Sequence, residues 1–228
     1  MSLRRLVPQP LRLFAWRILD RFGAVEFRWT PEEVVDATGP AYNVRCYLER
    51  RGIREVIAGI APDRVARGID VGCGYGRLSM VLTEFCSEVI GLEREPALVE
   101  QAVALLPEVR FIRVPTLIDL PLEDDTVDFA MTCSVLQHMT DDDARRVVGE
   151  IKRVVRAGGH VLLVEKTHTE QTWGDRQSGR RFLSQGRAVE RFAEWLAPFA
   201  LVRMERGRAE PGYPVDRVGT LMLFQAPV

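Results

Sequence analysis

The stretch IDVGCGYG at residues 69–76 decides the fold of this chain. An apolar strand runs into three closely spaced glycines, which let the backbone turn tightly and approach a ligand where a Cβ would clash. A second apolar stretch, VIGLE at residues 89–93, ends in Glu93, whose carboxylate can accept hydrogen bonds from ribose hydroxyls. A strand, a glycine-rich turn, a helix and a strand ending in an acid make the first half of a nucleotide-binding βαβ unit.

The spacing of the glycines differs from that of the dinucleotide-binding fingerprint. That fingerprint is G-x-G-x-x-G, with a helix N-terminus facing a pyrophosphate. Here the pattern is D-x-G-x-G-x-G, beginning at Asp70. A carboxylate at this point would repel a phosphate but suits a cationic ligand, so the pattern argues against a dinucleotide-dependent dehydrogenase.

The segment from Gly68 to Leu78 resembles motif I of class I S-adenosylmethionine (SAM) dependent methyltransferases. Further along, LPLEDDTVDF at residues 120–129 resembles a block of the type 11 methyltransferase family, and TCSVLQHM at 132–139 matches the segment after the family's fourth strand. The resemblance covers residues 63–165. It implies SAM as the cofactor and methyl transfer as the reaction.

The resemblance also implies which residues hold the cofactor. The methionine portion is expected over the glycine turn, oriented by Asp70, while Glu93 grips both ribose hydroxyls through charge-assisted hydrogen bonds. Thr116 stands where the family commonly has an adenine-binding aspartate, so the Thr116 hydroxyl, backbone groups, Asp119 and apolar contact stay open as alternatives. The expected cofactor-binding set is Asp70, Gly72, Cys73, Gly74, Gly76, Glu93, Thr116, Leu117, Cys133 and Ser134.

Two further segments are candidates for catalysis and for acceptor binding. His138 is the only histidine in a predicted site segment and is the candidate general base, with a structural role in orienting its loop as the alternative. The connection at 166–187 is long, and methyltransferases of this fold usually place substrate-selecting elements there. Trp173 is a candidate for stacking on an acceptor, and Arg176 and Arg180 for binding a phosphate or carboxylate. A solvated loop or a dimer contact is the alternative.

Alternating strands and helices predict the fold class and the domain organisation. We expect an α/β, Rossmann-like, doubly wound sheet of seven mostly parallel strands, closed by a C-terminal antiparallel hairpin. Residues 1–60 are expected to form a helical extension or cap, with helices at 3–22, 32–36 and 43–60, and 61–228 the SAM-binding domain. Expected helices of that domain are 77–85, 96–106, 141–156 and 187–196, and the glycine pair at 158–159 is expected to stop the third. Its expected strands are 69–72, 89–93, 109–114, 127–135, 160–165, 201–206 and 218–225.

Charge and cysteine usage limit the partners and the compartment. The 31 basic and 32 acidic side chains leave a net charge of −1, so no nucleic-acid partner is expected. The four cysteines form no C-x-x-C pair and no metal site, and they indicate a reducing, cytoplasmic location. Residues 3–22 form a basic amphipathic segment, which either contacts a membrane surface or packs on its own domain or on the second subunit of a homodimer.

Together these features predict a SAM-dependent methyltransferase that acts on a small-molecule acceptor. The N-P-P-Y motif of amino-methylating enzymes and the catalytic Pro-Cys of cytosine enzymes are both absent from the sequence. A saccharide or a lipid-linked intermediate, methylated on oxygen, is the favoured acceptor. The alternative is a non-catalytic SAM-binding partner subunit of the same fold.

Overall fold

The computed structural model of the chain describes residues 40–60, 64–168, 173–174, 181–182, 185–206 and 217–228. The expected helices at 3–22 and 32–36 lie outside these residues, and so do the alternative contacts of the first with a membrane, its own domain or a second subunit. The helix expected at 43–60 is confirmed, since α3 runs Pro40–Ala58. None of the helices in the described ranges is both long enough and apolar enough to cross a membrane.

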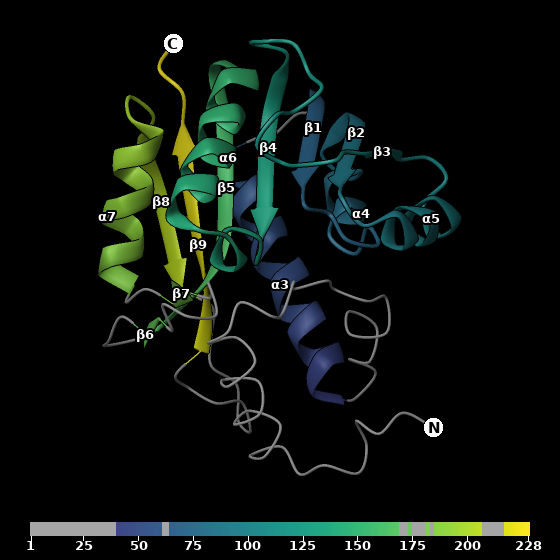
Figure 1. Cartoon of the computed structure of the whole chain (residues 1–228), viewed down its shortest axis with the longest axis horizontal. Coiled ribbons are helices and arrows are strands. Elements are labelled where there is room, and N and C mark those ends of the chain that lie inside the picture. Colours follow the sequence, from purple (N-terminus) through teal and green to yellow (C-terminus); the bar gives the residue numbers. More distant parts are fainter. Residues whose placement is uncertain (1–39, 61–63, 169–172, 175–180, 183–184, 207–216) are drawn as a thin grey trace.

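A seven-stranded sheet in the order β3-β2-β1-β4-β5-β9-β8 forms the centre of the molecule (Figure 1). Neighbouring strands from β3 to β5 run parallel, whereas β9 is antiparallel to both β5 and β8. The predicted Rossmann-like sheet with a C-terminal antiparallel hairpin is therefore confirmed. The strands are β1 Val65–Val71, β2 Cys86–Glu93, β3 Arg110–Arg113, β4 Val127–Cys133, β5 Val155–His168, β8 Ala200–Arg206 and β9 Arg217–Gln225.

Helices cover both faces of this sheet, with α6 and α7 on one face and α3 on the other (Figure 1). Successive residues of β5 enter two different hydrophobic clusters: Val161 and Leu163 pack on the α6 and α7 side, and Leu162 and Val164 on the α3 side. A strand buried on both faces reads as a continuous apolar run, which is why β5 was recognisable in the sequence. The helices are α3, α4 Ser79–Leu82, α5 Pro96–Leu105, α6 Asp141–Val154 and α7 Gln185–Leu196, with a short 3₁₀ turn, η2, at Leu136–His138.

The helix expected at 77–85 is much shorter than predicted, since α4 has only four residues. Helix α4 ends early because hydrogen bonds join the residues that follow it to the start of β1. Val65 donates its N–H to the Phe85 carbonyl at 2.9 Å, and Arg64 donates to the Cys86 carbonyl at 2.5 Å. Strand β2 consequently begins at Cys86, three residues before the strand that was predicted.

The glycine pair at 158–159 does not stop the preceding helix, as had been predicted. Helix α6 ends at Val154 and β5 begins at the next residue, with both glycines inside the strand. Gly158 has a φ of +72°, and the pairing of β4 with β5 shifts register in this region. A Cβ on Gly159 would lie 2.8 Å from Val155 Cγ1, so the glycines serve an irregular strand start rather than a helix cap.

The long connection at 166–187 contains a small hairpin. Strand β6, Trp173–Gly174, pairs antiparallel with β7, Arg181–Phe182. Strand β7 lies against η2 and β5, so the hairpin comes back to the edge of the sheet where the parallel strands end.

Candidate functional site

The candidate site lies where the parallel strands β1, β2, β4 and β5 end, at the lower edge of the sheet in Figure 1. Polar loops that follow adjacent parallel strands meet at such an edge, which is where ligands bind in open α/β sheets. The glycine turn after β1 and the acid at the end of β2 are in direct contact there. Gly72 donates its N–H to the Leu92 carbonyl at 2.8 Å, and Gly74 donates to Glu93 Oε2 at 2.9 Å.

The glycine turn has two packed glycines and one open one. All three have positive φ angles, +74° at Gly72, +57° at Gly74 and +82° at Gly76. A Cβ on Gly72 would lie 2.5 Å from Val135 Cγ2, and one on Gly76 would lie 2.8 Å from Phe111 Cζ. A Cβ on Gly74 would meet none of the atoms of the described residues within 4 Å. The turn therefore packs on the protein at both ends and leaves its middle free for a ligand.

Glu93 holds its carboxylate at the mouth of this turn. Besides the bond from Gly74, its Oε1 accepts hydrogen bonds from the N–H groups of Arg94, at 2.7 Å, and Glu95, at 2.9 Å. These backbone donors hold the side chain half-buried beside the turn. The structure thus places Glu93 directly beside the glycine turn.

Asp70 lies beneath the turn rather than at its surface. Its side chain is 2% exposed, and Oδ2 accepts a hydrogen bond from the Ser79 hydroxyl at 2.7 Å. Burial raises the pKa of Asp70 to about 6, although the bond from Ser79 and the charge of Arg77 act in the opposite direction. Sequence reasoning did not select Ser79. Its spacing from Asp70 could have suggested the contact, because a short turn brings the start of the helix back over the strand.

The loop between β3 and β4 carries the residues expected near adenine. Leu117 is buried in the hydrophobic core on the α6 side, and Asp119 is exposed. Thr116 Oγ1 accepts a hydrogen bond from the Ile118 N–H at 3.3 Å, so part of its hydrogen-bonding capacity is used within the loop. Val114 begins the loop and donates its N–H to the Glu93 carbonyl at 2.9 Å, which joins it to the glycine-turn side of the site.

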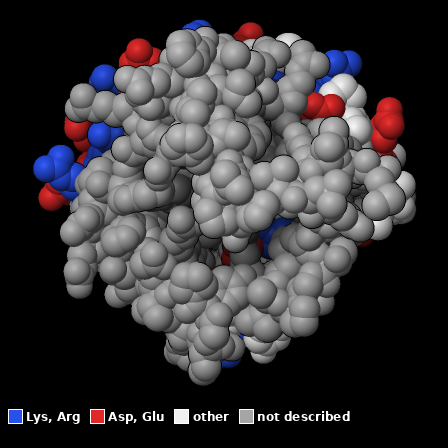
Figure 2. Space-filling model, turned by 60° about the horizontal axis from the view of Figure 1, so that its bottom comes forward, with Lys and Arg blue, Asp and Glu red and all other residues white. Residues whose placement is uncertain are grey.

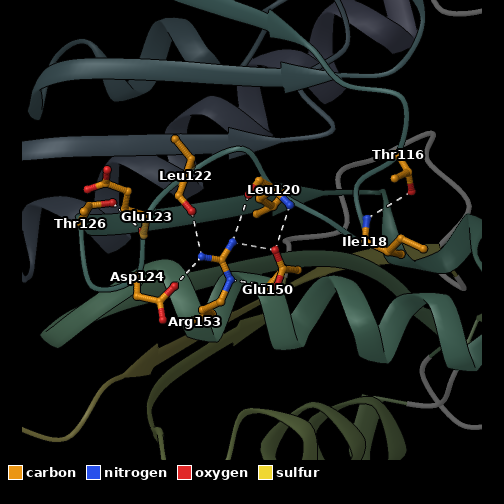
Figure 3. A network of polar contacts seen from close by, with 9 residues as sticks. All are labelled: Thr116, Ile118, Leu120, Leu122, Glu123, Asp124, Thr126, Glu150 and Arg153. Atoms are coloured by element: carbon orange, nitrogen blue, oxygen red, sulfur yellow. Dashed lines mark hydrogen bonds and ion pairs between the residues drawn. The ribbon is translucent and has the colours of Figure 1, made fainter.

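Helix α6 holds this loop through an arginine and a glutamate (Figure 3). The sequence analysis did not predict this contact. The Arg153 guanidinium binds both carboxylate oxygens of Glu150, at 2.9 and 2.7 Å, and donates to the carbonyls of Leu120, at 3.0 Å, and Leu122, at 2.8 Å. It also binds Asp124 at 2.6 Å. Glu150 in turn accepts the Leu120 N–H at 2.9 Å. The Arg153 hydrogen bonds lower the pKa of Glu150.

The turn after β4 is held by a buried carboxylate that was also missed. Glu165, in β5, is 3% exposed and accepts the N–H groups of Val135, Leu136 and Gln137, each at 3.2 Å. It also accepts the Thr132 hydroxyl at 3.3 Å. Burial raises the pKa of Glu165 to about 7, against the opposing effect of these hydrogen bonds.

The residues expected near the reacting end of the cofactor sit on this same turn. Cys133 ends β4, and Ser134 follows with a φ of +57°, its N–H donating to the Val164 carbonyl at 2.7 Å. His138 closes the turn, with its Nε2 3.0 Å from the side-chain amide nitrogen of Gln137. Because an amide nitrogen only donates, the histidine Nε2 is the acceptor in this contact.

A pocket opens beside the turn, between η2, α6, α7 and β5. Its walls combine polar groups, which include Gln137 and Glu165, with the apolar and aromatic side chains of α7. At one wall, Arg191 forms an ion pair with Asp141 at 2.6 Å and lies 5.6 Å above the Trp195 ring. The lining residues are Leu136, Gln137, Met139, Asp141, Ala144, Glu165, Thr167, Ala188, Arg191, Phe192 and Trp195.

The structure thus brings the glycine turn, Glu93, Cys133, Ser134 and His138 to one edge of the sheet. Trp173 is placed in β6, in the hairpin that reaches η2, whereas Arg176 and Arg180 lie outside the described residues. Within the described ranges, no three Cys, His, Asp or Glu side chains are grouped so that they could hold a metal ion.

Known proteins share this domain. Residues 69–163 match the type 11 family described as "Methyltransferase domain". The chain is 28% identical over 149 residues to an uncharacterized methyltransferase of Mycobacterium tuberculosis, a match that covers 65% of this chain and 60% of that protein. It is 30% identical over 133 residues to a tRNA (carboxymethyluridine(34)-5-O)-methyltransferase of Saccharomyces cerevisiae, covering 58% of this chain and 44% of the yeast protein. These matches therefore span less than two thirds of the relatives' own length.

The arrangement of strands and helices is also found among solved structures. A SAM-dependent methyltransferase from Leishmania major superposes with a TM-score of 0.71 at 18% identity, covering 85% of this chain and 77% of that one. At this level of identity the likeness establishes the fold alone.

Proposed function

We propose that this chain, which contains a class I methyltransferase domain of the type 11 family with SAM as its cofactor, transfers a methyl group to a small-molecule acceptor. The observation that carries the proposal is the pairing of an open glycine with an acid. In the part of the chain that the structure describes, nothing lies within 4 Å of a Cβ position on Gly74, and the Glu93 carboxylate accepts the N–H of the same residue.

The residues at this edge fit SAM. Its ribose would bind the Glu93 carboxylate, its methionine portion the open face of the glycine turn, and its adenine the loop at Thr116 and Leu117. Asp70 and Glu93 place two carboxyl groups around the turn, which favours a ligand that carries positive charge over a phosphate. When bound, SAM supplies a methyl group that is already activated by the sulfonium.

The contribution of the protein is therefore mainly alignment of the acceptor with that methyl group. Proximity and orientation can supply roughly 7–11 kcal/mol of a reaction barrier. A hydroxyl acceptor would also benefit from a base, and His138 is the candidate on this edge. The contact of its Nε2 with Gln137 engages a lone pair of the ring and supports the structural alternative. A His138→Ala variant with near wild-type turnover would remove it from the catalytic residues.

The acceptor we propose is small, with a saccharide or a lipid-linked intermediate methylated on oxygen as the favoured class. A polyanion needs a surface rich in lysine and arginine, since neutralised phosphates supply much of the affinity. The chain carries a net charge of −1, and the described charged side chains visible around the rim of Figure 2 are of both signs. The yeast relative acts on tRNA, so tRNA belongs among the acceptors to be tested.

A non-catalytic SAM-binding subunit of the same fold is the second candidate. This candidate is favoured because Thr116 replaces the family's adenine-binding aspartate. The Thr116 hydroxyl accepts a hydrogen bond from its own loop. The two candidates make the same prediction for cofactor binding and opposite predictions for methyl transfer.

Calorimetric titration with SAM and S-adenosylhomocysteine tests the cofactor site. We expect binding by the wild type and a loss of about 100-fold in Glu93→Ala, because two charge-assisted hydrogen bonds to ribose are removed. Glu88→Gln is the matched control, since Glu88 lies on the same strand but pairs with Arg67 at 2.7 Å. If folded wild-type protein binds neither compound, the proposed function is wrong.

Methyl transfer is then measured with SAM labelled on the methyl group. Small hydroxyl-bearing acceptors, glycolipids and bulk tRNA are compared under the same conditions. Label transferred to a small acceptor supports the enzyme, label transferred to tRNA overturns the small-acceptor class, and cofactor binding with no transfer to any acceptor favours the partner subunit.

A further inference from the structure

A side chain of the neighbouring strand binds the turn after β4 at several points. Glu165 accepts three consecutive backbone N–H groups, those of Val135, Leu136 and Gln137, and also the Thr132 hydroxyl. Three amides that point at one carboxylate fix both the position and the orientation of the turn. A buried N–H that loses its acceptor destabilises the fold, so these hydrogen bonds favour the observed position of the turn against Glu165.

This turn also touches the cofactor side of the molecule. A Cβ on Gly72 would collide with Val135, which means that the first residue held by Glu165 already packs on the glycine turn. Ser134 precedes Val135 and has a positive φ of +57°, a conformation that a residue with a side chain adopts only where its surroundings hold it. Contacts on both sides of the turn therefore specify its shape, with the glycine turn on one side and Glu165 on the other.

Among the residues that the structure describes, none forms an ion pair with Glu165. Its hydrogen-bond partners are backbone amides and the Thr132 hydroxyl, and β9 places Thr220 beside it in the sheet. Among the described side chains that line the neighbouring pocket with it, the other ionisable groups are Asp141 on α6 and Arg191 on α7, which pair with each other. The carboxylate is thus held by dipoles in a buried place, where its charge is sensitive to pH.

We propose that Glu165 is a positioning residue, which sets the turn at 134–138 against the glycine turn and so determines how tightly the cofactor site closes on the sulfonium end of SAM. The inference rests on the proposed function, because it assigns that turn to the cofactor. In this role Glu165 acts through the backbone of the turn.

The charge of Glu165 gives this role a signature that a merely structural residue would lack. An ionised carboxylate accepts several N–H groups well, whereas a protonated carboxyl group keeps less accepting capacity and gains a donor. Because burial raises the pKa of Glu165 to about 7, the turn should tighten as the pH rises through that value. SAM affinity should therefore increase from pH 6 to pH 8 in the wild type.

The test compares the wild type with Glu165→Gln by calorimetry with SAM between pH 6 and pH 8.5. The amide has a similar shape, but its nitrogen cannot accept an N–H, and it does not ionise. We expect SAM affinity about tenfold weaker at pH 8 in the variant and little changed between pH 6 and pH 8. Glu165→Asp keeps the charge and should restore part of the pH dependence.

Asp128→Asn is the matched control. Asp128 is also a buried carboxylate on a backbone donor, since it accepts the Arg67 N–H at 2.6 Å, but it lies near the start of β4, at the opposite edge of the sheet. Its replacement should leave the pH profile of SAM binding unchanged. An equal change in Asp128→Asn and Glu165→Gln would overturn the proposal, because it would reveal a general effect of lost stability.

Hydrogen exchange provides a readout that does not depend on the ligand. Amides of residues 135–137 should exchange about tenfold faster in Glu165→Gln than in the wild type, after correction for the intrinsic rates. If the variant does not fold, the same amides in the wild type should become better protected as the pH rises through about 7. Unchanged protection in both experiments contradicts the inference even if SAM binds, whereas absent SAM binding with the expected exchange overturns only the proposed function.

Discussion

Two glutamates hold the two loops that border the site, and they do so in opposite electrostatic settings. Glu150 binds the loop before β4 and shares its charge with Arg153, and its pKa is lowered by that partner. Glu165 binds the turn after β4 with backbone amides and a hydroxyl, and burial raises its pKa to about 7. A carboxylate that has an arginine partner stays charged over a wide pH range, whereas one held only by dipoles can change its charge near neutrality.

The difference suggests that Glu150 and Glu165 have distinct roles at the site. Because the Arg153 hydrogen bonds lower the pKa of Glu150, we expect this pair to hold its loop over a wide pH range, and it lies apart from Thr116 (Figure 3). Glu165 is closer to the glycine turn, through Val135. The charged form of Glu165, which grips the turn best, is also the form that costs folding stability.

Removal of Arg153 should have the largest effect on stability. Arg153→Met leaves Glu150 without its cation and the Leu120 and Leu122 carbonyls without these donors, so we expect a loss of about 3–4 kcal/mol in the free energy of unfolding. Urea denaturation measures it. A loss below about 1 kcal/mol would mean that the loop is held by its apolar residues alone, and the comparison of the two anchors would fail.

Stability should depend on pH through Glu165, with a definite sign. The pKa in the folded state is about 7 and the ordinary value is 4.5, so the folded state binds the extra proton between these values. The contribution of this group is therefore fully present below about pH 4.5 and is lost as the pH rises to about 7, a change of about 3 kcal/mol. Asp70 adds a change of the same sign, since its pKa is raised to about 6.

The difference between wild type and Glu165→Gln isolates the part due to Glu165. Denaturation curves at pH 5, 6, 7 and 8 should show the wild type losing more stability than the variant over this range. Parallel curves for the two proteins would show that Glu165 is ionised throughout and would remove the contrast with Glu150.

An intermediate loss of stability is expected when the N-terminal cap of α6, the helix that carries Glu150 and Arg153, is removed. Thr140 caps α6, its hydroxyl accepting the Asp143 N–H at 3.1 Å. Thr140→Ala should cost about 1 kcal/mol of unfolding free energy, because a cap acceptor is lost. The variant should still bind SAM with the wild-type pH profile, since the cap leaves the hydrogen bonds of Glu165 in place.

The smallest effect is expected for an arginine–glutamate pair that holds no loop. Arg54 binds Glu84 in a forked pair of 2.6–3.1 Å, with both side chains 41% exposed. Glu84→Gln should change the free energy of unfolding by about 0.5 kcal/mol or less, since water already screens the pair. A loss as large as that of Arg153→Met would show that charge pairing, and not the loop carbonyls, explains the Arg153 effect.

Much of the site could be predicted because its parts are local in the sequence. The glycine turn, the helix start and Glu93 fall within 24 residues, from Asp70 to Glu93, and each position has its own chemical signature. The pairing of Gly74 with Glu93 follows from a parallel βαβ unit, in which the ends of neighbouring strands meet. The local sequence did not predict the role of the glycine pair at 158–159, since a glycine can serve a helix end or an irregular strand equally well.

The sequence by itself determined the order of strands and helices, the apolar runs of the core, the glycine turn and the acid at the end of β2. Only the tertiary structure decided which carboxylates hold the loops. Glu165 lies 28 to 33 residues from its partners and Glu150 lies 30 residues from Leu120, so no local spacing connects them. Each looks in the sequence like an ordinary acid of a strand or a helix. Their role arises because the packed sheet and α6 remove water from the amides of the loops, and a buried amide must then find an acceptor within the protein.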